Sequence, residues 1–179
     1  VSASGLDSPL VGIDVRPADG QLYGLTRKAT VVTIDPGTGA ATFKSTLTQT
    51  VPAGVRAAVD FNPAANRLRI IGRNGTNLRA DVDTGTVTKD TDISFTQPNP
   101  FGGTTPSVIA AAYSNSVNGA KATVLWDIED RTDALALGAY AVLDDGEVDR
   151  LVAALTPLAK AVVATGDIPA TTPMGPTLN

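Results

Sequence analysis

Two aspartates occupy the same place in two similar stretches of the sequence, and this pair is the first candidate for chemistry. Residues 11–25 read VGIDVRPADGQLYGL, residues 57–71 read AAVDFNPAANRLRII, and the two align without a gap at an offset of 46 positions. The alignment matches Asp14 with Asp60. Converging carboxylates could hold a cation or act as acid and base in glycoside hydrolysis. Because residues that recur in each repeat usually serve the repeat, we expect instead that each accepts backbone N–H groups of the turn that follows.

The densest group of acids lies later in the chain. It consists of Asp127, Glu129, Asp130 and Asp133. Calcium prefers several oxygen ligands on one loop, so these residues are candidate calcium ligands. Their spacing lacks the central glycine and the bidentate glutamate of an EF-hand loop, which favours a solvated turn. We therefore expect no cofactor and leave calcium as the one open ion.

The remaining charged residues of note belong to turns and to one strand. Asp35 and Asp83 each stand at a turn, and we expect both to be structural turn acids. The arginines of the second repeat could bind an anionic ligand. We predict instead that they form ion pairs with nearby acidic side chains. These arginines are Arg67, Arg69, Arg73 and Arg79.

The absence of two residue types narrows the chemistry. The chain has no histidine and no cysteine, which excludes a Ser-His-Asp relay, a cysteine nucleophile, thiolate metal sites and disulfides. The net charge of −4, with no basic run longer than Arg27 and Lys28, argues against nucleic acid as a partner. No apolar run approaches the roughly 20 residues that span a bilayer, and no signal peptide is visible.

Short strands must position these residues. The apolar segments of the first repeat are 10–15, 21–26, 30–35 and 40–47, and those of the second are 57–61, 67–72, 77–82 and 86–95. Asp, Asn and Gly turns separate them, and residues 31–35 alternate with the period of two that is typical of a strand. A period of about 40–50 residues with this make-up is typical of β-propeller blades. We predict an all-β fold of about three propeller-like antiparallel blades, either incomplete or completed by oligomerisation.

The third repeat is looser than the first two. We predict strands at 108–113, 122–128 and 134–142, whereas 147–163 fits either a strand or a helical stripe, with a strand favoured for 147–152. The chain is divided into one propeller-like domain, 1–164, and an extended tail, 165–179. The three repeats of the domain are 7–50, 54–96 and 107–155.

Together these motifs resemble an uncharacterised bacterial family of domains of unknown function. The segments that carry the resemblance include LVGIDVRPADGQLYGLT, VDFNPAANRLRIIGRNGTNLRADVDTG and VIAAAYSNSVNGAKATVLWDIEDRTDAL, and they cover roughly residues 5–155. The resemblance implies a secreted or cell-surface protein and brings no catalytic residues. Family members usually have further strands before and further repeats after this region, so the resemblance also implies a shortened version.

Two classes of function remain. We expect a non-enzymatic extracellular structural, assembly or adhesion module that associates with itself as a homo-oligomer or filament subunit, through sheet edges or terminal segments such as 161–164. Contact with a cell surface or polysaccharide fits the same class. The alternative is a carboxylate-dependent hydrolase or lyase that acts on carbohydrate. Carboxylates converging in a deep cleft would favour the enzyme, and open faces and edges would favour assembly.

Overall fold

The computed structural model describes residues 2–95, 101–131 and 134–138 of the 179-residue chain, and every regular element among them is a β-strand. The predicted strand at 147–152, the segment 161–164 and the tail at 165–179 lie outside the described residues. The strands are β1 (Leu10–Val15), β2 (Leu22–Thr26), β3 (Thr30–Ile34), β4 (Ala41–Thr46), β5 (Ala57–Asn62), β6 (Arg67–Gly72), β7 (Asn77–Ala80), β8 (Val87–Lys89), β9 (Val108–Tyr113), β10 (Leu125–Glu129) and β11 (Ala134–Gly138).

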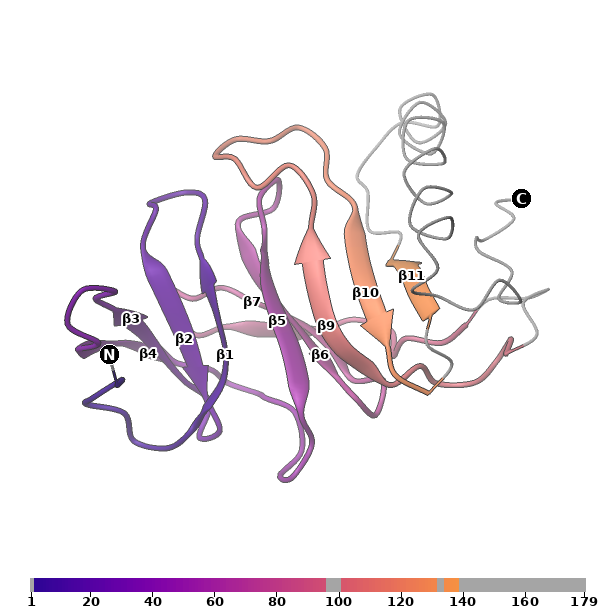
Figure 1. Ribbon diagram of the computed structural model, residues 1–179, viewed down its shortest axis with the longest axis horizontal. Helices are drawn as coiled ribbons and strands as arrows, with labels where there is room; N and C mark the ends of the chain where they lie inside the picture. Colours follow the sequence, from indigo (N-terminus) through magenta and orange to yellow (C-terminus); the bar gives the residue numbers. More distant parts are fainter. Residues whose placement is uncertain (1, 96–100, 132–133, 139–179) are drawn as a thin grey trace.

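The strands form three antiparallel sheets, each a simple meander, as the predicted all-β, blade-like fold requires. Blade 1 has the order β1-β2-β3-β4, blade 2 has the order β5-β6-β7-β8, and blade 3 contains β9, β10 and β11 with β10 in the centre. The first strands of the blades, β1, β5 and β9, lie next to one another, and the remaining strands extend away from them (Figure 1). We call the contact between blades 1 and 2 seam 1, and the contact between blades 2 and 3 seam 2.

The apolar core lies in these seams. In seam 1 the side chains of Tyr23 and Leu25 from blade 1 pack with Phe61 and Ile70 from blade 2, and all four are at least 98% buried. A smaller cluster fills seam 2. It consists of Ala58, Ile71, Val108, Tyr113 and Leu125. Burial of apolar surface therefore joins the blades to one another as well as folding each one.

The 46-residue offset recurs in the turns. Asp35 accepts hydrogen bonds from the backbone N–H groups of Gly37 and Thr38, and Asp81 accepts the same pair from Asp83 and Thr84. The two turns end at Gly39 and Gly85, with φ of 78° and 76°. Such left-handed positions strongly favour glycine because it has no Cβ. The repeat in the sequence is thus a repeat of turn geometry.

Two predicted strands are longer than the observed ones. The strand predicted at 86–95 ends at Lys89, because the Asn77 side chain donates to the carbonyl of Thr91 and replaces a regular ladder bond. The segment predicted at 122–128 enters the sheet only at Leu125. Before it, Thr123 and Val124 bond to Ser114 in an irregular loop connection.

One face of blade 1 is not covered by another blade within the described residues. Cross-strand registers place two rows of side chains on this face: Ile13, Gly24, Val32 and Phe43 in one, and Val15, Leu22, Ile34 and Ala41 in the other. Every member is apolar. Ile13, Val15 and Phe43 are 52%, 50% and 66% exposed. We call this surface the outer face of blade 1.

Candidate functional site

A carboxylate joins the blades at each seam. Asp14 on β1 accepts a hydrogen bond of 2.7 Å from the backbone N–H of Phe61 on β5. Asp60 on β5 accepts one of 2.7 Å from the backbone N–H of Tyr113 on β9. We call this arrangement, a carboxylate of one inner strand bound to an amide of the next, the carboxylate clasp.

The clasp corrects the role predicted for Asp14 and Asp60. Both were expected to bind the turn that follows them, but each carboxylate instead accepts a hydrogen bond from the neighbouring blade. The reason is that successive side chains of a strand point to opposite faces, and these two point into the seams. Asp14 also binds the N–H of Val15, with its second oxygen at 2.7 Å.

An aromatic residue of the incoming blade completes each clasp. Phe61 meets the ring of Tyr23, which stands opposite Asp14 in the sheet, with ring centroids 5.3 Å apart in an edge-to-face arrangement. Tyr113 accepts a hydrogen bond of 3.2 Å from Nε of Arg69. The two seams therefore share one plan, with an apolar partner in the first and a charged one in the second.

Seam 1 also holds an ion pair between a buried arginine and a half-exposed aspartate. Arg16, 6% exposed, donates to both carboxylate oxygens of Asp83, at 3.1 and 2.7 Å. Lys44 binds the same carboxylate at 2.8 Å, and Asp19 contacts Arg16 at 3.3 Å. The hydrogen bond with Asp83 raises the pKa of Arg16, and the two cations hold the pKa of Asp83 well below its usual range. Asp83 thus joins two blades, whereas the turn role predicted for it belongs to Asp81.

Seam 2 contains a polar network around Arg69. Its guanidinium binds Asn77 and Asp90, each at 2.7 Å, in addition to Tyr113. Asp127, on β10, is only 5% exposed and its Oδ1 has no hydrogen-bond partner among the described residues. Burial raises the pKa of Asp127 to about 7, and the charge of Arg69 opposes the shift. The Asp127 carboxyl therefore stays protonated from acidic pH up to about pH 7, where an ordinary aspartate is ionised.

Asp60 has a similarly raised pKa. Its burial raises the pKa to about 7, the N–H of Tyr113 acts in the opposite direction, and the negative charge of Asp14 adds to the rise. Asp60 and Asp127, both carboxyl groups of seam 2, therefore favour the protonated form below about pH 7.

The predicted calcium candidates do not share a loop site. Asp127 belongs to seam 2, the fully buried Glu129 accepts from the N–H of Ser107 at 2.8 Å, and Asp130 pairs with Arg73. Asp133 lies outside the described residues. Among the residues that are described, no three acids form a group suited to a metal ion.

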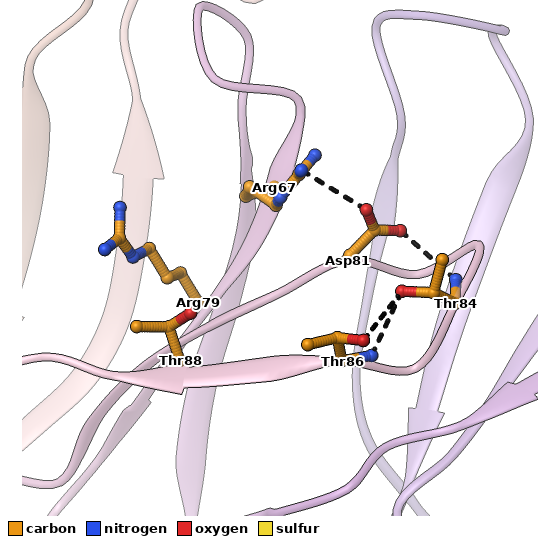
Figure 2. Close-up of a pocket in the computed structure, with 6 residues that line it drawn as sticks. All are labelled: Arg67, Arg79, Asp81, Thr84, Thr86 and Thr88. Atoms are coloured by element: carbon orange, nitrogen blue, oxygen red, sulfur yellow. Dashed lines mark hydrogen bonds and ion pairs between the residues drawn. The ribbon is translucent and has the colours of Figure 1, made fainter.

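The arginines of the second repeat pair with acids, as predicted. Arg67 binds Asp81 at 3.2 Å, Arg79 binds Asp90 at 3.2 Å, and the two remaining arginines make the contacts given above. Arg67 and Arg79 also line a shallow polar hollow on blade 2. Its other lining residues are Asp81, Thr84, Thr86 and Thr88. Figure 2 shows Arg67 reaching toward Asp81, with the hydroxyls of Thr84 and Thr86 bound to each other at 3.0 Å.

The sequence did not predict the ion pair between Arg16 and Asp83. Asn62 takes the place of Arg16 in the second repeat, so the repeat gives no signal there. Arg16 precedes Pro17, and this pattern predicts only a turn. Its ion pair joins residues 67 positions apart, which only the packing of two blades brings together.

A family model matches residues 1–149 of the chain, and its description is domain of unknown function, DUF4394. The chain belongs to this family. The match confirms the resemblance seen in the sequence motifs. No curated protein matches the chain. Within the described part of this DUF4394 protein, no helix has the length and apolar character needed to cross a membrane.

Proposed function

We propose that this DUF4394 protein is a non-enzymatic extracellular module that works by packing its blade faces against other proteins, including further copies of itself. The observation that carries the proposal is the outer face of blade 1. A sheet face with two wholly apolar rows, and with Ile13, Val15 and Phe43 at least half exposed, has the character of an interaction surface.

The carboxylates support a structural role over an enzymatic one. A glycosidase needs two carboxyl groups around an open cleft that admits a sugar. Asp14 and Asp60 are instead bound to backbone amides in the seams. These hydrogen bonds stabilise the packing of the blades. They also occupy carboxylate oxygens that would otherwise contact a substrate. An extracellular location is supported by the resemblance to a family whose members are typically secreted.

The native mass of the protein tests this proposal. Sedimentation velocity over a wide range of concentrations should show dimers or larger species, and removal of residues 165–179 tests whether the tail is the connecting segment. Assembly that survives this removal assigns the contact to the blades. A chain that remains monomeric at every concentration, with or without residues 165–179, contradicts the proposal.

Contact with polysaccharide would use the polar hollow of blade 2. Threonine hydroxyls and the half-exposed guanidinium of Arg79 are groups that bind sugar hydroxyls and carboxylates. Affinity electrophoresis in a gel containing a uronic-acid polymer should retard the wild type and not the Arg79→Gln variant. Arg131→Gln is the control, because Arg131 is exposed on blade 3. Equal mobility of all three proteins with and without polymer would contradict this contact.

A further inference from the structure

The outer face of blade 1 has a buried counterpart in blade 2. Adding the repeat offset of 46 to each of its eight residue numbers gives the equivalent residues of blade 2. They are Val59, Phe61, Leu68, Ile70, Leu78, Ala80, Val87 and Lys89. All of them except Lys89, which is exposed at the end of β8, belong to the apolar cluster of seam 1. Phe61 and Leu68 are 1% and 2% exposed there, whereas Val15 at the corresponding position to Phe61 is 50% exposed. The outer face of blade 1 is thus built like a seam face without the blade that covers it.

Blade 3 has an outer face of the complementary kind. The faces that receive the next blade pair a small residue with a large aliphatic one: Gly12 with Leu25 in blade 1, and Ala58 with Ile71 in blade 2. Blade 3 repeats this with Ala110 opposite Ile128. Leu25 and Ile71 are almost fully buried in their seams, but Ile128 is 49% exposed.

Among the described residues the two outer faces do not meet, because they lie at opposite ends of the row of blades (Figure 1). A second copy supplies both missing halves at once. The two seams within the chain are also directional, since each blade offers one kind of face to its predecessor and another to its successor. The same order applied between chains is a head-to-tail contact.

We propose that the outer face of blade 1 binds the outer face of blade 3 of a second copy, in the manner of seams 1 and 2. This inference rests on the proposed function and names its partner and geometry. Joined at both ends, the described blades of two copies would form a ring of about six blades, within the usual range for propellers. Copies joined at one end each would form an open filament.

This new seam would lack a carboxylate clasp. Position 112 of blade 3 corresponds to Asp14 and Asp60 but is alanine, and it pairs with Trp126 as Asp14 pairs with Tyr23. The N–H of Val15, which corresponds to the clasped amides of Phe61 and Tyr113, is bound to Asp14 of its own strand. The contact between copies is therefore apolar.

Two single-face variants test the geometry. Ile13→Asp places a charge on the blade 1 face and Ile128→Asp places one on the blade 3 face, and each should weaken self-association at least about 100-fold. Mixed together, the two variants should form a 1:1 complex, because each retains the face that the other has lost. Val117→Asp is the control, since Val117 is 56% exposed on a loop away from both faces.

The outcomes separate this inference from the proposed function. Wild-type assembly that persists in either single variant, or variants that fail to combine in the mixture, overturns the head-to-tail contact but not self-association. A monomeric wild type overturns both. Circular dichroism of each variant checks that it folds.

Discussion

Replacement of Asp127 by asparagine should make the free energy of unfolding of the protein less dependent on pH. The pKa of this buried carboxyl is about 7 in the folded protein, whereas that of a solvated aspartate, as in the unfolded chain, is 3.8. Between these values the folded state binds more protons than the unfolded state, so the free energy of unfolding falls as pH rises toward 7 and is level above it. Between pH 5 and pH 8, the free energy of unfolding falls only over the two pH units from 5 to about 7. This fall corresponds to about 3 kcal/mol.

Asparagine has nearly the same shape as a protonated aspartate and does not titrate in this range. The wild type should therefore lose about 3 kcal/mol more than Asp127→Asn on going from pH 5 to pH 8. Urea unfolding at both pH values measures this difference, with fluorescence of Trp126, the single tryptophan and the neighbour of Asp127, as the probe. Asp92→Asn is the matched control, because the Asp92 side chain is 55% exposed and should be solvated in both states.

The refuting result is equal pH dependence in the wild type and Asp127→Asn. It would mean that the carboxyl is ionised and solvated in the folded protein, or that it binds a group that holds its charge. A variant that loses stability equally at both pH values would point instead to a hydrogen bond that asparagine cannot make.

Three further predictions concern the seams and metal content. Arg16→Met should destabilise the fold by about 1.5–3 kcal/mol in urea unfolding, because it removes the charge-assisted hydrogen bonds of the buried Arg16 guanidinium; a loss under about 1 kcal/mol, the worth of a surface pair, would contradict this. Gly85→Ala should cost clearly more than Gly20→Ala, since both have positive φ but only a Cβ at Gly85 would overlap the Thr46 carbonyl oxygen; equal melting temperatures would show that the seam adjusts. Elemental analysis of the native protein should find no stoichiometric zinc, copper or nickel, since the sequence has no histidine or cysteine.

The sequence predicts local elements of this fold well. Strands are signalled by alternation and turns by Asp and Gly, and both signals are local, as the matching turns at Asp35 and Asp81 show. The ends of β8 and β10 were predicted less well. There, the deciding contacts are made by side chains of other segments, such as Asn77, whose partner lies 14 residues away.

The candidate site could be predicted only in part. The repeat identified Asp14 and Asp60 as a matched pair with a structural role, but it does not tell which blade each carboxylate contacts. The pairing of the second-repeat arginines follows from charge and proximity in sequence. The ion pair of Arg16 with Asp83 and the burial of Asp127 depend on how separate sheets pack, and no local pattern encodes that.

The carboxylate clasp also bears on how such blades could be exchanged. One half of the clasp is a side chain and the other half is a backbone N–H, so only the preceding blade needs a particular residue. For this hydrogen bond, the following strand needs at that point only a residue other than proline, which has no N–H; the aromatic side chains found there serve the packing of the seam. A row of blades built this way can be lengthened by duplication without a compensating change in the new neighbour. No clasp can form to the blade that follows a strand without the aspartate, as at Ala112 of blade 3.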